Sequence, residues 1–147
     1  MEEEIYNSFM KIYFAGSITG GRDDKEIYLE IINELKKYGK VLTEHIGSDK
    51  LTQFGEKISD KEIYKRDINW VKMSDVLVAE VTHPSFGVGI EIARATEFKK
   101  KVICIYRKIE GRKLSAMISG CPGILVFEYQ ELKDLENIFL KELWIIK

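Results

Sequence analysis

The chain has 147 residues, of which 45% are hydrophobic and 32% charged, a composition typical of one globular domain. Its formal net charge of −1 provides no basic field for a nucleic-acid backbone, and no apolar run is long enough to cross a bilayer. Neither a nucleic-acid polymer nor a membrane is therefore expected as a partner.

The chain begins with an acidic lead-in, residues 1–10, that lacks the apolar core of a secretory signal. We expect a cytoplasmic protein with a single domain over residues 11–147. Cys104 lies in an apolar run and Cys121 in a loop, so we expect one buried thiol and one incidental thiol. Neither has the spacing of a metal site.

Strand-like and helix-like patterns alternate along the domain. The expected strands are residues 11–15, 41–43, 76–79, 102–106 and 124–127. The first helix is expected over residues 23–38 with Gly39 as its cap, and a capping box at Ser59 predicts a second helix ending near Met73. This alternation predicts a flavodoxin-like α/β three-layer sandwich, with a five-stranded parallel sheet in the order 2-1-3-4-5 and helices on both faces.

In such a sheet, ligands bind beyond the carboxyl ends of the strands where the strand order reverses. Residues 16–22, G-S-I-T-G-G-R, follow the first strand and offer backbone N–H groups, a hydroxyl and an arginine to an anion such as phosphate. The alternative is a turn that needs positive φ at Gly20 and Gly21. The loop has neither the Walker pattern nor the dinucleotide fingerprint.

Two acidic residues lie on apolar stripes of expected helices. They are Glu91, just after the glycine-containing loop that leaves the third strand, and Asp67, on the preceding helix. A buried carboxylate is costly without a partner or a task. Each alone would favour a structural acid, whereas together they favour acid/base and nucleophilic chemistry. A separation of about 5 Å would suit a retaining glycosidic displacement. Glu80 is expected to support the site rather than react.

Two further residues have an ordinary interpretation and a functional one. Tyr13 could hydrogen-bond a carboxylate at the sheet edge, although tyrosines in strands are more often core residues. Ser115 is expected to cap a short helix, and the alternative is a phosphate donor.

Five segments carry a family resemblance: Y-F-A-G-S-I-T-G-G-R (13–22), V-L-T-E-H (41–45), R-D-I-N-W (66–70), V-A-E-V-T-H-P-S-F-G-V-G-I-E (78–91) and L-S-A-M-I (114–118). In this order they resemble the 2'-deoxynucleoside 5'-phosphate N-hydrolases of the nucleoside 2-deoxyribosyltransferase superfamily. The resemblance implies a homodimer that cleaves the N-glycosidic bond of deoxynucleoside monophosphates. The products would be free base and 2-deoxyribose 5-phosphate, made without metal or cofactor.

The resemblance also implies residue roles. Glu91 would be the nucleophile that forms a glycosyl-enzyme ester, Asp67 would assist proton transfer, and Tyr13 would hold the Glu91 carboxylate. The implied substrate-binding residues are Gly16, Ser17, Ile18, Thr19, Gly20, Gly21, Arg22, His45, Ser85, Gly87, Ala116, Met117 and, from the partner subunit, Ser115. Thr19 stands where the family leads us to expect arginine, and His83 where we expect glutamine.

Three alternatives remain at this stage. The chain could transfer deoxyribose to a second base, hydrolyse ribonucleotides such as CMP, or sense nucleotides without catalysis. Serines at positions 85 and 115 suit a phosphate better than a bare 5'-hydroxyl, which favours the nucleotide hydrolase over the nucleoside transferase.

Overall fold

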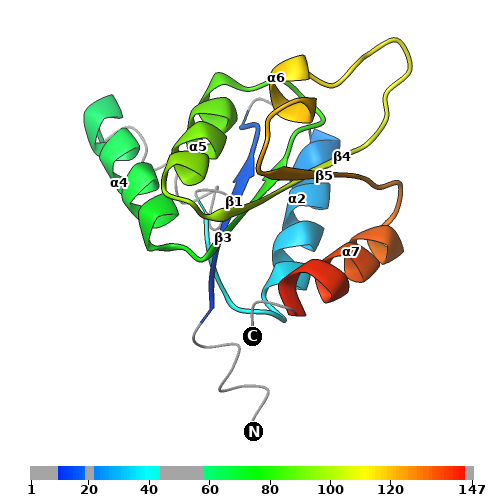
Figure 1. The fold of residues 1–147 in the computed structure, drawn as a ribbon, viewed down its shortest axis with the longest axis horizontal. Coiled ribbons are helices and arrows are strands. Elements are labelled where there is room, and N and C mark those ends of the chain that lie inside the picture. The colour runs from blue at the N-terminus through cyan, green and yellow to red at the C-terminus, as the bar shows by residue number, and fades with distance from the viewer. Residues whose placement is uncertain (1–9, 19–21, 44–57, 145–147) are drawn as a thin grey trace, which may run out of the picture.

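The computed structural model describes residues 10–18, 22–43 and 58–144. Its elements are β1 (Lys11–Gly16), α2 (Arg22–Leu35), β2 (Lys40–Leu42), α4 (Asp60–Met73), β3 (Val76–Glu80), α5 (Phe86–Glu97), β4 (Lys101–Tyr106), α6 (Ala116–Ser119), β5 (Ile124–Glu128) and α7 (Leu132–Trp144). Figure 1 shows α2 and α7 on one side of the sheet and α4 and α5 on the other. Among the helices described here, none combines the length and apolar character needed to cross a membrane.

The sheet has five parallel strands in the order β2-β1-β3-β4-β5, which confirms the predicted topology. Gly16 at the end of β1 pairs with Glu80 at the end of β3, and Glu80 pairs with Ile105 of β4. The carboxyl ends of these three central strands therefore meet at one edge, where the loops that follow β1, β3 and β4 begin.

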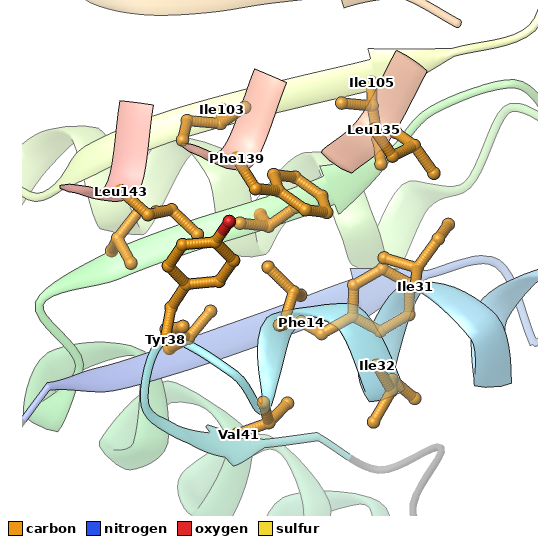
Figure 2. Close-up of a cluster of buried hydrophobic side chains, with 14 of the residues drawn as sticks. Phe14, Ile31, Ile32, Tyr38, Val41, Ile103, Ile105, Leu135, Phe139 and Leu143 are labelled. Atoms are coloured by element: carbon orange, nitrogen blue, oxygen red, sulfur yellow. The ribbon is translucent and has the colours of Figure 1, made fainter. Parts of the chain in front are cut away.

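One face of the sheet packs against α2 and α7. Phe14 of β1 meets the ring of Tyr28 edge to face, with centroids 5.7 Å apart, and Phe139 of α7 is fully buried in the same cluster. Figure 2 shows the side chains of the two helices packed against those of the strands. Burial of such aromatic and aliphatic groups is the main stabilising contribution to this layer.

The opposite face packs against α4 and α5. Successive side chains in a strand point to opposite faces, so Tyr13, Ala15, Leu77 and Ala79 join this second cluster while their neighbours join the first. Glu80 follows Ala79 and therefore belongs to the α2 and α7 side. This alternation separates Glu80 from the helices that carry Glu91 and Asp67.

The helix ends predicted from the local sequence are partly right. Ser59 caps α4 as predicted, because its Oγ accepts a hydrogen bond from Glu62 N at 3.2 Å. The predicted cap at Gly39 is wrong: α2 ends at Leu35, and Gly39 is not among the described glycines with positive φ. A Cβ at Gly39 would lie 2.4 Å from Met10 O, so glycine is needed where the chain passes the start of β1.

Candidate active site

Glu91 and Asp67 lie on neighbouring helices over the same face of the sheet. Both carboxylates are buried, with 7% of each residue exposed, as the sequence pattern predicts. Arg66 Nε donates a hydrogen bond to Asp67 Oδ1 at 3.0 Å, and its guanidinium lies 4.8 Å from the ring centroid of Trp70. Asp67 is therefore held by a cation from its own helix.

Tyr13 lies beneath these two helices, on β1. It is fully buried in the cluster that contains Val71 of α4 and Val88 of α5. Val71 is one turn from Asp67, and Val88 is one turn from Glu91. The three residues for which the sequence predicts catalytic roles thus lie in one layer formed by β1, α4 and α5.

The first turn of α5 leaves its backbone open. Ser85 caps this helix by accepting a hydrogen bond from Val88 N at 3.3 Å, which leaves its hydroxyl proton for another acceptor. Apart from the backbone of the helix itself and the adjoining residues, a Cβ at Gly87 would come no closer than 3.9 Å to another atom, Ser85 Oγ, and one at Gly89 would meet nothing within 4 Å. Glycine within a helix lowers stability by about 0.5–1 kcal/mol relative to alanine. No neighbouring atom of the described residues requires glycine at these two positions, so the open space favours close approach of a ligand to the backbone.

A cavity of about 930 Å³ lies between the start of α5 and the segment that joins β4 to α6. Ser85, Gly87, Ser115 and Met117 line it, whereas Glu91, Asp67, Tyr13 and Ala116 are not among its described lining residues. Ser115 caps α6 by accepting a hydrogen bond from Met117 N at 3.2 Å, which confirms the predicted cap. Glu91, Asp67 and Tyr13 therefore belong to an acidic layer, while the two serines line a separate cavity, and α5 contributes to both.

The loop after β1 is described in part. Gly16 lies against Tyr28: a Cβ there would come within 3.0 Å of the ring, so a larger residue would require the ring to shift by a few tenths of an ångström. Ser17 is buried and Ile18 is 69% exposed. The predictions on Thr19, Gly20, Gly21, His45 and the Arg22 side chain lie outside the described residues.

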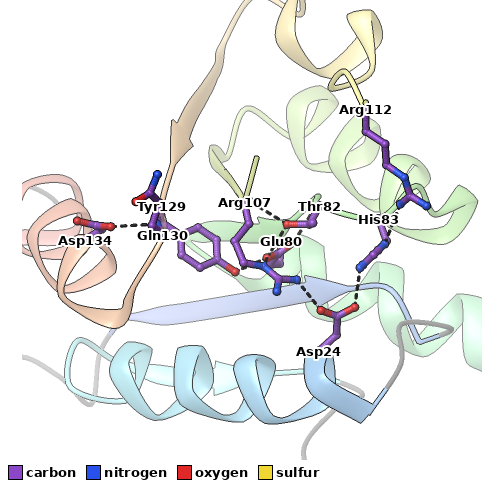
Figure 3. Close-up of polar contacts among 9 residues, drawn as sticks. All are labelled: Asp24, Glu80, Thr82, His83, Arg107, Arg112, Tyr129, Gln130 and Asp134. Atoms are coloured by element: carbon purple, nitrogen blue, oxygen red, sulfur yellow. Dashed lines mark hydrogen bonds and ion pairs between the residues drawn. The ribbon is translucent and has the colours of Figure 1, made fainter. Parts of the chain in front are cut away.

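A buried ion-pair network at the same sheet edge is absent from the sequence predictions. Asp24 Oδ1 accepts a hydrogen bond from Arg107 Nη2 at 2.5 Å, and Asp24 Oδ2 lies 2.7 Å from His83 Nε2. Figure 3 shows this chain continuing to Glu80, which is fully buried and accepts a hydrogen bond from the Tyr129 hydroxyl. Burial and the Glu80 carboxylate raise the pKa of Tyr129 far above its ordinary value, so its hydroxyl remains a donor.

The sequence contains a signal for this network. Asp24 lies four residues before Tyr28 on the apolar stripe of α2, the same type of position that marked Glu91 and Asp67. Glu80, expected to support the site, contacts Thr82 N at 2.6 Å and lies 3.6 Å from Arg107 Nε. The network therefore fixes the loops that leave β3 and β4.

Comparison with known proteins gives the family. The family model described as nucleoside 2-deoxyribosyltransferase matches residues 12–123, and the chain belongs to this family. A Danio rerio protein named 5-hydroxymethyl-dUMP N-hydrolase is 50% identical over 132 residues, covering 88% of this chain and 92% of the relative. The Homo sapiens protein of the same name is 44% identical, covering 82% and 72% of the two chains.

A solved structure shares the fold at much lower identity. The CMP N-glycosidase of Clostridium botulinum superposes with a TM-score of 0.63 and is 20% identical, covering 88% of this chain and 97% of the other. This likeness concerns the fold alone.

Proposed function

We propose that the protein hydrolyses the N-glycosidic bond of 2'-deoxynucleoside 5'-monophosphates to free base and 2-deoxyribose 5-phosphate. The observation that carries the proposal is the pair of buried carboxylates, Glu91 and Asp67, on two packed helices beside a cavity lined by serine hydroxyls and cations. Two relatives with 50% and 44% identity are named N-hydrolases of one such nucleotide, 5-hydroxymethyl-dUMP.

The proposed reaction has two displacements. Glu91 attacks the anomeric carbon, the carbon–nitrogen bond breaks, and the base leaves with a proton supplied through Asp67. Water then attacks the anomeric carbon of the glycosyl ester, with Asp67 taking its proton, and Glu91 returns as a carboxylate. Tyr13 positions the Glu91 carboxylate from below.

The proposed phosphate site combines hydroxyls, backbone N–H groups and an arginine. In one subunit the 5'-phosphate is bound by Ser17, Arg22, Ser85 and Gly87. The exposed backbone at the start of α5 contributes to this binding. Ile18 and His45 contact the base, and Ala116 and Met117 complete the substrate site. Ile18 is 69% exposed, so its side chain is accessible to a base.

We also propose a homodimer in which Ser115 of the partner subunit completes the phosphate site. Phe86 is 95% exposed and Met117 is 82% exposed, and both line the cavity. Large apolar side chains left in water beside a site favour cover by another chain.

We place the protein in the cytoplasm, where its free cysteines, Cys104 and Cys121, remain reduced.

The test is a panel of deoxynucleoside and ribonucleoside monophosphates, with the free base separated by chromatography. We expect base release from one or more deoxynucleotides and much slower release from the ribonucleotides. Adding a second free base and finding a new nucleotide would instead establish a transferase. No base released from any deoxynucleotide would contradict the hydrolase proposal and favour nucleotide sensing.

A trapping experiment tests the covalent step. A 2'-fluorinated deoxynucleoside monophosphate slows both displacements because fluorine destabilises the positive charge at the anomeric carbon. We expect mass spectrometry of digested protein to find the fluorinated sugar phosphate on the peptide that contains Glu91. Base release without any such adduct would favour direct attack by water.

A further inference from the structure

Arg112, on the segment that joins β4 to α6, contacts the loop that carries Ser85. Its Nη1 lies 3.2 Å from Nδ1 of His83, and all the residues concerned, His83, Ser85, Arg112 and Ser115, line the cavity. His83 is two residues before Ser85, and Arg112 is three residues before Ser115. The contact between the arginine and the imidazole therefore bridges the two walls of the cavity.

The His83 ring has a defined hydrogen-bonding arrangement in this bridge. Arginine can only donate, so Nδ1 of His83 accepts from Arg112 and Nε2 carries the ring proton. Nε2 then donates to Asp24 Oδ2 at 2.7 Å. Asp24 is itself 5% exposed and fixed by Arg107. Figure 3 shows His83 between Asp24 and the arginine, so a buried anchor orients an exposed guanidinium.

The charge of Arg112 is directed at an imidazole rather than at an acid. Arg107 is balanced by Asp24 and Glu80, whereas no ion pair of Arg112 with a carboxylate occurs among the described residues. Lys108 and Lys113 also line the cavity, and its described lining contains neither aspartate nor glutamate. A cavity with excess positive charge, hydroxyl groups and a helix start has the chemistry that recognises a phosphate.

We propose that Arg112 binds the 5'-phosphate in the site of its own subunit, beside Ser85, and that His83 and Asp24 are positioning residues that aim its guanidinium. This inference rests on the proposed function. The guanidinium donates up to two hydrogen bonds to phosphate oxygens while one of its N–H groups remains on His83 Nδ1. Preference for a nucleotide over a nucleoside then depends on a residue from the β4–α6 segment as well as on the loop after β1.

The test uses binding of 2-deoxyribose 5-phosphate, measured by calorimetry, together with steady-state base release. For Arg112→Ala we expect about tenfold weaker binding of the sugar phosphate and a similar rise in KM for deoxynucleotides, with kcat changed much less. Arg112→Lys keeps the charge but loses the planar fork, so an intermediate loss is expected. Lys141→Ala, which removes one exposed charge from the last turn of α7, should bind as wild type does.

Variants at His83 separate positioning from simple packing. His83→Ala removes both nitrogens and should raise KM several-fold, whereas His83→Gln offers an amide donor and acceptor and should restore most of the binding. Circular dichroism and thermal unfolding check that each variant is folded. Equal KM values for Arg112→Ala and wild type, or equal losses for His83→Ala and His83→Gln, would overturn the proposal.

The two proposals fail in different ways. Base release by wild type with unchanged sugar-phosphate binding in Arg112→Ala would refute the role of Arg112 and leave the hydrolase proposal intact. Absence of base release by wild type, with weaker binding in Arg112→Ala, would refute the hydrolase and support the phosphate ligand.

Discussion

Arg94 of α5 donates a hydrogen bond from Nη1 to the hydroxyl of Tyr64 on α4, at 2.6 Å. Arg94 lies one turn after Glu91, and Tyr64 lies one turn before Asp67. The contact therefore joins the two helices close to the carboxylates proposed to share the reaction. It gives α4 and α5 a specific attachment in addition to the apolar layer between them and the sheet.

A double-mutant cycle on this pair tests the attachment. Tyr64→Phe keeps the ring and removes the hydroxyl, and Arg94→Met keeps an extended apolar stem. Because the bond is exposed, we expect a coupling free energy of only about 0.5–1 kcal/mol in urea unfolding. Zero coupling would show that the contact adds nothing to the packing of the helices.

The two cysteines should differ sharply in reactivity. Burial raises the pKa of Cys104 to about 12, so below pH 9 its thiol is protonated as well as inaccessible. Cys121 is half-buried in the turn before β5. With iodoacetamide at pH 8 we expect one modified cysteine in native protein, Cys121, and two after denaturation. Modification of Cys104 at a similar rate in native protein would contradict this arrangement of β4.

Mixing two inactive variants tests whether Ser115 acts across the dimer. In a heterodimer of Glu91→Gln and Ser115→Ala chains, one site combines an intact Glu91 with an intact Ser115 of the partner subunit. We expect mixing after mild dissociation to restore about a quarter of wild-type activity if Ser115→Ala alone is strongly impaired, since random pairing gives half heterodimers with one active site each. If Ser115 serves its own subunit, the mixture should show no such gain.

The sequence was sufficient to predict the sheet order and the burial of both carboxylates. The local signals agree with the tertiary structure. They are the apolar runs that form β3 and β4 and the capping box at Ser59. Asp67 and Glu91 could be placed because a helical stripe has a fixed period. These predictions needed no knowledge of what lies opposite each residue.

The features that were wrong or absent all depend on contacts between distant segments. Gly39 is required by Met10, which is far away in sequence, and local helix rules suggested a cap instead. The bridge from Asp24 through His83 to Arg112 joins three separate loops or helices, so no periodic pattern reveals it. Sequence spacing predicts which face a residue occupies, but the partner on that face is known only from the fold.

The most direct test of the central claim compares base release by two variants of α5. Glu91→Gln removes the proposed nucleophile with little change in volume, and Glu97→Gln removes a carboxylate that is 70% exposed and pairs with Arg94 at 3.3 Å. We predict that Glu91→Gln lowers kcat for deoxynucleoside monophosphates by about a thousandfold or more while still binding them, and that Glu97→Gln is close to wild type. Base release by Glu91→Gln at a rate near that of wild type would contradict the account.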